Sequence, residues 1–221
     1  MLVGRSMHDG WLSNAYVVGD ESGGVAVFVD SGAPLDPLLE FVEREGLTPT
    51  HLLRTHTHVD HVEHEDELRD LFGIPVVTGD LDTGGLTVRA LSLPGHSDDG
   101  VAFVVNDEIA FTGDVLFKDA VGGGPADVCR ASVMRLMELD PAIRVLPGHT
   151  DETTIGREWE QNPFVTYWRG VAPSLGEAVR VGGEEAELVV WSPDYDGKGK
   201  ALVRRGDGVE AIVGGSRVER G

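Results

Sequence analysis

Residues 56–61 read His56-Thr57-His58-Val59-Asp60-His61, which places three imidazoles and one carboxylate in six positions. The run follows the apolar pair Leu52-Leu53 and precedes a helical pattern that starts near Val62, so we predict a loop between a strand and a helix. Borderline divalent metals bind imidazole nitrogen and carboxylate oxygen, and one compact loop can supply several such ligands. The stretch therefore predicts a metal site. The alternative is an exposed polar loop whose charge varies with pH.

Three more candidate ligands stand where a predicted strand has just ended. His96 follows Leu93-Pro94-Gly95, Asp114 follows Phe111-Thr112-Gly113, and His149 follows Leu146-Pro147-Gly148. A turn glycine before each residue lets the backbone swing the side chain toward a shared point. Each residue alone is equally explained as a turn residue or a helix cap. Together with the histidine-rich loop, they predict one shared centre above packed sheets.

The periodicity of the chain predicts a mixture of sheets and helices. Apolar and β-branched runs predict strands over residues 14–18, 25–29, 51–54, 75–78, 86–93, 101–105, 109–111 and 144–146. Helical spacing predicts helices from Leu35 to Gly46, from Val62 to Gly73 with Leu68, Leu71 and Phe72 inside, over Val133–Leu139, and up to Trp168. This mixture indicates sheets with helices on their outer faces.

The composition changes near residue 171. Residues 171–221 are rich in glycine, contain short β-like runs, and include the turn pairs Asp196-Gly197 and Asp207-Gly208. We therefore predict a catalytic domain over residues 1–170 and a small glycine-rich β-hairpin appendage over residues 171–221.

Composition limits the location and the partners. The chain has 221 residues, one cysteine and no apolar run near the roughly 20 residues that cross a bilayer. Its first residues lack the basic start and apolar block of a secretory signal, so we expect a cytoplasmic protein with no membrane partner. The formal net charge of −20 makes nucleic acid a poor partner, because such a surface repels phosphate backbones.

The motifs quoted above resemble the metallo-β-lactamase superfamily, and their order and spacing are similar to the hydroxyacylglutathione hydrolase (glyoxalase II-like) branch. The resemblance covers about residues 10 to 165 and includes Asp30-Ser31-Gly32 and the segment from Thr153 to Phe164. It implies an α+β fold, a four-layer αββα sandwich with the metals at one edge. The small C-terminal β appendage replaces the helical domain that grips glutathione in the classical enzymes, which puts glutathione in doubt.

The resemblance also implies a role for each candidate residue. His56, His58 and His96 would hold a first divalent metal, and Asp60, His61 and His149 would hold a second. Asp114 would bridge the two ions, and Asp30 would steady the metal loop by orienting its imidazoles. Zinc is the first expectation for both ions, with iron and manganese as alternatives.

Such a centre predicts a metal-dependent hydrolase of small thioesters or related acyl esters, by attack of a metal-bridging hydroxide on the carbonyl. Asp60 would also act in catalysis by positioning or deprotonating the water. Ser97 and Cys129 are poor candidates for a nucleophile, because the nearby histidines are committed to metal. Lys118 is a candidate for binding a substrate carboxylate; an ordinary surface lysine is the alternative.

Several alternatives remain open from the sequence. A mononuclear iron oxidoreductase of the persulfide dioxygenase kind uses related ligands, and lactone or β-lactam hydrolysis needs the same metals. His64 either faces the site or lies in solvent on a helix, and His8 and His51 are expected to be structural or exposed. Trp159, Tyr167 and Trp168 either wall a cleft near His149 or pack a helix onto the core.

Overall fold

The computed structural model describes residues 1–221 and contains two central β-sheets that pack face to face. The first sheet has the order β1-β2-β3-β4-β5 and the second β14-β13-β9-β8-β7-β6. The strands of the first sheet are β1 Leu2–Met7, β2 Asn14–Gly19, β3 Val25–Val29, β4 Thr48–Leu53 and β5 Val76–Val77. Those of the second are β6 Leu81–Asp82, β7 Thr87–Ser92, β8 Val101–Val105, β9 Ile109–Gly113, β13 Arg144–Pro147 and β14 Thr153–Thr154.

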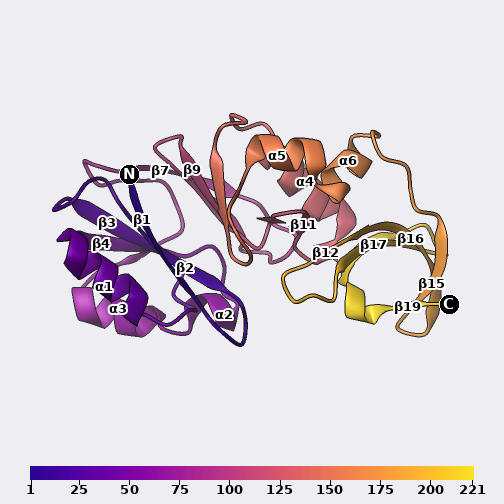
Figure 1. Cartoon of the computed structure of the whole chain (residues 1–221), viewed down its shortest axis with the longest axis horizontal. Helices are drawn as coiled ribbons and strands as arrows, with labels where there is room; N and C mark the ends of the chain where they lie inside the picture. Colours follow the sequence, from indigo (N-terminus) through magenta and orange to yellow (C-terminus); the bar gives the residue numbers. More distant parts are fainter.

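Helices cover the outer face of each sheet, which gives the predicted four-layer α+β sandwich (Figure 1). Helices α1 Asp36–Glu45 and α3 Glu65–Phe72 pack on the first sheet, while α4 Ala126–Leu136, α5 Ile155–Gln161 and α6 Pro163–Trp168 lie over the second. Apolar side chains from the two inner faces fill the layer between the sheets. They include Val27 and Val29 of β3, Phe103 of β8 and Phe111 of β9. The predicted fold class is therefore confirmed.

Some predicted boundaries were wrong. The helix expected from Val62 is two helices, because α2 Val59–Val62 already begins inside the histidine-rich stretch, after an extended His58. Leu71 is 56% exposed, since Leu68 and Phe72 occupy the inward stripe of α3. The helix expected over Val133–Leu139 instead spans Ala126–Leu136.

No helix has the length and the hydrophobicity that a bilayer span requires.

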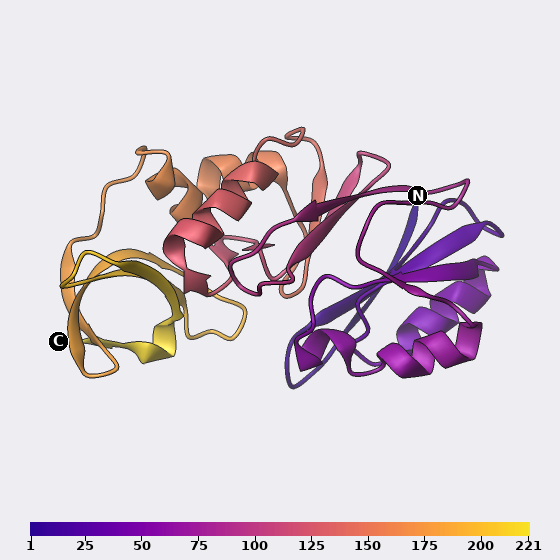
Figure 2. The same cartoon turned by 180° about the vertical axis from the view of Figure 1, so that it is seen from behind.

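The C-terminal segment forms a third sheet, of order β12-β18-β17-β16-β15-β19, at the end of the molecule opposite α1 and α3 (Figures 1 and 2). Its strands are β15 Glu177–Val181, β16 Glu184–Ser192, β17 Lys200–Arg205, β18 Glu210–Gly214 and β19 Val218–Arg220. The edge strand β12 Gly124–Pro125 comes from the first 170 residues and pairs with β18. The short hairpin of β10 Leu116–Phe117 and β11 Ala120–Val121 precedes it.

Candidate metal centre

The strand order brings the ends of four strands to one edge of the sandwich. β3 runs parallel to β4, and β9 runs parallel to β13, so the loops that follow each pair leave the sheets on the same side. Asp30 follows β3 and the histidine-rich stretch follows β4, while Asp114 follows β9 and His149 follows β13. The fold therefore positions residues that are far apart in the sequence around one point.

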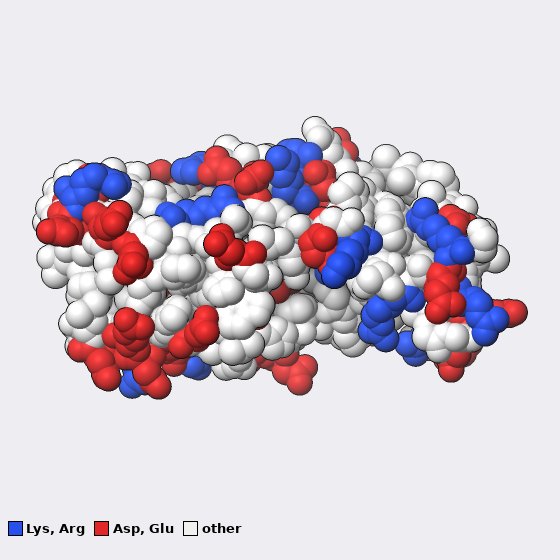
Figure 3. All heavy atoms as spheres, turned by 60° about the horizontal axis from the view of Figure 1, so that its bottom comes forward, with Lys and Arg blue, Asp and Glu red and all other residues white.

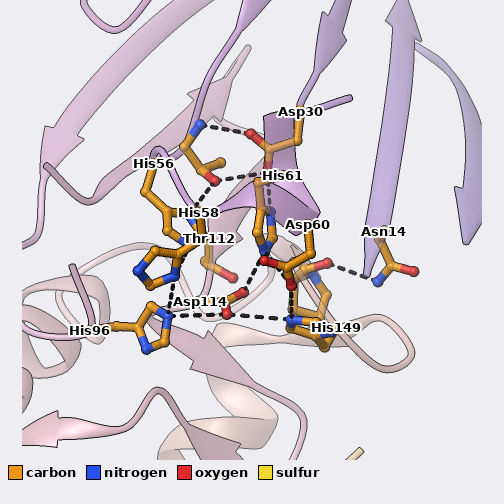
Figure 4. A network of polar contacts seen from close by, with 12 residues as sticks. Asn14, Asp30, His56, His58, Asp60, His61, His96, Thr112, Asp114 and His149 are labelled. Carbon is orange, nitrogen blue, oxygen red and sulfur yellow. Dashed lines mark hydrogen bonds and ion pairs between the residues drawn. The ribbon is translucent and has the colours of Figure 1, made fainter. Parts of the chain in front are cut away.

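The structure brings all seven predicted ligands together (Figure 4). Their ligand atoms form three groups within 4.8 Å: His56, His58 and His96; His56, His61 and Asp114; and Asp60, His61 and His149. The carboxylate of Asp114 lies between the groups. Its Oδ1 is 3.3 Å from His61 Nε2, and its Oδ2 is 3.4 Å from both His96 Nε2 and His149 Nε2.

Each of four imidazoles is held by its Nδ1 atom, which turns Nε2 into the site. His61 Nδ1 donates to Asp30 Oδ2 at 2.8 Å, and His149 Nδ1 donates to the carbonyl of Leu12 at 2.9 Å. His96 Nδ1 donates to the carbonyl of Gly123 at 3.2 Å. The carboxylate and carbonyl acceptors fix a proton on Nδ1, so each of these rings turns its Nε2 atom inward, and Nε2 can act as a ligand once it carries no proton.

The fourth imidazole is fixed through a hydroxyl. Thr55 Oγ1 donates to Asp30 Oδ2 at 2.7 Å and therefore accepts from His56 Nδ1 at 3.0 Å. His56 Nε2 then faces His58 Nδ1 at 3.1 Å, and His96 Nε2 faces the same atom at the same distance. One proton on His58 Nδ1 cannot serve both acceptors fully, whereas a cation between the three nitrogens satisfies all of them.

Two buried atoms at the centre, His61 Nε2 and Asp114 Oδ1, have no hydrogen-bond partner. A buried polar atom without a partner costs free energy, about 1–3 kcal/mol for each. Bound cations would satisfy these atoms and the three facing nitrogens together. The donor set of imidazoles and carboxylates thus fits divalent metals.

Asp30 is a buried residue that is hydrogen-bonded to the histidine-rich stretch and to the residue just before it. Its Oδ1 accepts the backbone N–H of Thr55 at 2.8 Å, and its Oδ2 accepts Thr55 Oγ1 and His61 Nδ1. These bonds hold Asp30 at a φ of 55°, a conformation that few residues other than glycine adopt. The carboxylate therefore ties the end of β3 to both halves of the histidine-rich stretch.

Asp30→Asn is expected to weaken metal affinity by about 10–100-fold, because an amide cannot accept all three of these hydrogen bonds. Titration with zinc against a chromophoric chelator measures the change. Asp36→Asn, an exposed position in the first turn of α1, is the matched control and should leave affinity unchanged. Equal affinities for Asp30→Asn and the unmodified protein would contradict this role.

Charges within the centre shift the pKa values of its histidines. Burial lowers the pKa of His56 to about 4, so this ring is neutral at pH 7. Burial also lowers the pKa of His149, but Asp114 and then Asp60 outweigh it and raise the value to about 9. The pKa of His61 is raised well above its usual range, since Asp114 and Asp30 again outweigh burial.

Metal binding should therefore release protons near pH 7. The raised pKa values keep His149 and His61 protonated in the metal-free protein, whereas a metal binds only the neutral ring. The apparent zinc affinity should rise as pH rises from 7 toward 9, by up to about tenfold per pH unit for each proton released. Calorimetry in buffers of different ionisation enthalpy measures this release, and a binding heat independent of buffer would contradict it.

The other residues singled out in the sequence lie outside the centre. His64 faces Glu63 and Glu67, and His8 stacks on Trp11 with a centroid distance of 4.5 Å. His51 is half-buried beside Thr50. Lys118 is half-buried between β10 and β11, and its role in binding substrate stays a prediction.

The aromatic residue that stacks on His149 is not one of those expected. Trp168 is buried in the core under α4 to α6, and Trp159 and Tyr167 pack against the same core, so their packing interpretation holds. Tyr195, from the loop between β16 and β17, stacks on His149 instead, with centroids 4.0 Å apart and planes 5° apart. No local pattern in the glycine-rich tail pointed to this residue.

The comparisons with known proteins agree with this geometry. Residues 8–91 match the family model described as the metallo-beta-lactamase superfamily. An uncharacterized protein of Mycobacterium leprae, ML0493, is 33% identical over a match that covers 69% of this chain and 93% of that protein. The chain belongs to the metallo-beta-lactamase superfamily.

Some of the relatives have descriptive names. The probable metallo-hydrolase YqgX of Bacillus subtilis is 29% identical, and the hydroxyacylglutathione hydrolase GloC of Haemophilus influenzae is 26% identical; each match covers 69% of this chain and 92% of the relative. Among solved structures, the BLEG-1 B3 metallo-beta-lactamase has a TM-score of 0.69 at 28% identity and covers 75% of this chain and 100% of its own. ETHE1 from Myxococcus xanthus has a TM-score of 0.66 at 29% identity, with coverages of 74% and 84%.

Proposed function

We propose that this protein is a metal-dependent hydrolase of small thioesters or related acyl esters that works with two divalent ions, zinc foremost. The observation that carries the proposal is the convergence of imidazole nitrogens and carboxylate oxygens around the shared carboxylate of Asp114. His56, His58 and His96 would hold one ion, Asp60, His61 and His149 the other, and Asp114 both. When bound, such ions polarise a carbonyl and generate a nucleophile from water at neutral pH.

The chain itself offers no competing nucleophile near the centre. Burial raises the pKa of the Cys129 thiol to about 11, and this side chain packs against Gly95 and Gly124. Ser97 donates to Asp99 and has no histidine partner. Water is therefore the nucleophile that the site favours, and a thioester suits it because a thiolate leaves without a strong general acid.

Asp60 is the carboxylate that lies toward the opening of the site. Its side chain is 23% exposed, against 7% for Asp114, and its Oδ2 is 3.5 Å from His149 Nε2. Burial raises its pKa, but the hydrogen bond with His149 and the charge of His61 together outweigh burial and keep the value below its usual range. Asp60 is therefore anionic at neutral pH, and we assign it the orientation of the attacking water.

Elemental analysis followed by an ester and thioester panel tests the proposal. Protein purified without added metal should contain about two divalent ions per chain, and a chelator should reduce thioester turnover by at least about a thousandfold. Added zinc should restore it. Asp60→Asn, loaded with zinc until it contains as many ions per chain as the unmodified protein, should turn over at least tenfold more slowly, on the order expected for loss of acid–base help.

One bound iron per chain with oxygen uptake and no hydrolysis would replace the proposal with the mononuclear oxidoreductase. Turnover that persists after verified metal loss would refute the mechanism altogether. Preferential cleavage of lactones or β-lactams would keep the metal centre and change the substrate class.

A further inference from the structure

The C-terminal sheet reaches the metal centre through the loop that joins β16 to β17. Tyr195 in this loop lies parallel to the His149 imidazole and meets the Phe117 ring edge-on at 5.7 Å. Phe117 in turn meets His149 at 5.7 Å. One metal-site imidazole is thus flanked by two aromatic rings, and one of them belongs to the C-terminal sheet.

Lys200, the first residue of β17, places a buried ammonium beside these rings. Its Nζ lies 5.8 Å from the Tyr195 centroid and 5.9 Å from the Phe117 centroid, with 11% of the side chain exposed. The chain has three lysines, and Lys198 is 63% exposed. Lysine is almost never this buried unless its charge is paired or used.

The partner of Lys200 pairs its charge but accepts only part of its hydrogen-bond donors. Asp194 Oδ2 lies 2.9 Å from Nζ, and the Asp194 side chain is 3% exposed. An ammonium has three donors, and no second acceptor contacts this one. Asp194 Oδ1 is also buried without a hydrogen-bond partner. The pair therefore retains both donor and acceptor capacity next to the centre.

The position of this pair is fixed relative to the metal site. The β12–β18 pairing joins the two parts of the chain, and Ser192 Oγ donates to the carbonyl of Asp119 just before the loop. Arg204 donates to the hydroxyl of Tyr167 at 2.9 Å. A common core contains side chains of α4 and α6 together with Val190 and Leu202 of the C-terminal sheet.

Because the rest of the molecule is strongly negative, a lysine ammonium beside the metal site indicates which kind of substrate binds there. Residues 1–170 carry most of the net negative charge. Figure 3 shows acidic groups gathered at the end away from the C-terminal sheet, whereas basic and acidic groups alternate over the C-terminal sheet. An anionic substrate is repelled by the acidic part and needs a local positive charge to bind. Lys200, although paired with Asp194, offers ammonium N–H donors to an anion beside the centre.

We propose that the C-terminal sheet completes the substrate-binding side of the metal site, with Tyr195 as an aromatic wall beside His149 and Lys200 as the cation that binds a substrate carboxylate. This inference rests on the proposed function and specifies its substrate as an anionic thioester or ester. Lys200 binds with the N–H groups that Asp194 leaves free, while the metals act on the carbonyl.

Matched thioesters of N-acetylcysteamine test the role of Lys200. The succinyl and butanoyl thioesters differ by one terminal carboxylate. Lys200→Met should raise KM for the succinyl thioester by about 10–100-fold, the range for a lost hydrogen bond to a charged group, and leave KM for the butanoyl thioester within twofold. Lys198→Met is the control for loss of an exposed charge and should change neither. Lys200→Arg should restore part of the preference.

Binding without turnover provides an independent readout. The S-(3-carboxypropyl) and S-butyl thioethers of N-acetylcysteamine replace the reactive carbonyl by a methylene, and calorimetry gives their Kd values on the zinc-loaded protein. Only the carboxylate-bearing thioether should lose affinity in Lys200→Met. If the protein prefers the carboxylate-bearing thioether but hydrolyses none of the probes, the proposed function is wrong, whereas the binding role of Lys200 is supported.

Tyr195 is tested with a pair of variants. Tyr195→Phe keeps the stacked ring and should leave KM within threefold, whereas Tyr195→Ala should raise KM for both thioesters by about tenfold at unchanged zinc content, in line with the loss of an aromatic contact. Equal KM changes for both thioesters in Lys200→Met, or no change in either, would overturn the assignment of Lys200. Identical KM values for Tyr195→Phe and Tyr195→Ala would show that the Tyr195 ring does not contact the substrate.

Discussion

Asp114→Asn is expected to reduce kcat/KM by at least about a thousandfold, equivalent to about 4 kcal/mol, and to lower metal content below two ions per chain. The carboxylate has one oxygen near His61 and the other near both His96 and His149, so it serves both halves of the centre. An amide supplies only one acceptor oxygen and no charge. The positive charges of two ions would then lack their shared counter-ion.

The fold should survive this substitution, because asparagine has nearly the shape of aspartate. Circular dichroism and elemental analysis separate loss of metal from loss of structure. Asp151→Asn is the matched control, since Asp151 follows His149 closely in sequence but is 77% exposed. A variant with two bound ions and activity within tenfold of the unmodified protein would show that Asp114 does not bridge.

Gly32→Ala should have the second large effect, and it acts through the backbone. A Cβ at Gly32 would lie 1.6 Å from the carbonyl oxygen of Asp60 and 2.6 Å from the backbone nitrogen of His61. The neighbouring Ser31 is hydrogen-bonded to the same turn: its N–H donates to the His61 carbonyl at 2.8 Å, and its carbonyl accepts from His64 at 3.0 Å. A methyl group therefore cannot enter without displacing α2.

We expect Gly32→Ala to destabilise the protein by about 3 kcal/mol or more and to weaken metal binding at least tenfold, because overpacking against backbone cannot relax through a rotamer change. Urea unfolding of the metal-free protein and zinc titration of the folded variant measure the two effects. Gly79→Ala, where no atom lies within 4 Å of the new Cβ, is the control. Unchanged stability and zinc affinity would be incompatible with this tight approach.

Much of the two-sheet fold was predictable, because its strands are apolar, β-branched and bounded by glycine or proline turns. The candidate metal ligands could be found from the sequence for a related reason, since each follows a strand end in a recognisable motif. The short strands β10 to β12 were missed, because two-residue strands carry no periodicity and depend on their tertiary partners. The early start of α2 was missed because ligand residues obscure the helical pattern.

The contribution of the tail to the site could not be predicted. Tyr195 and Lys200 stand in a glycine-rich segment whose local pattern indicates only turns and strands. Their contact with His149 and Phe117 depends on how one sheet docks on the rest of the chain. Long-range packing of this kind leaves no signal in spacing or composition, whereas the roles of Trp159 and Trp168 followed from ordinary helix packing.

The strand β12 has a consequence for how the molecule holds together. Because Gly124 and Pro125 form the edge of the C-terminal sheet and lie just ahead of α4, the last fifty or so residues are not a detachable module. Removing them would uncover the apolar surface that Val190, Leu202 and Ile212 now cover. Melting of that sheet and loosening of the layer beneath α4 should thus occur as one cooperative event.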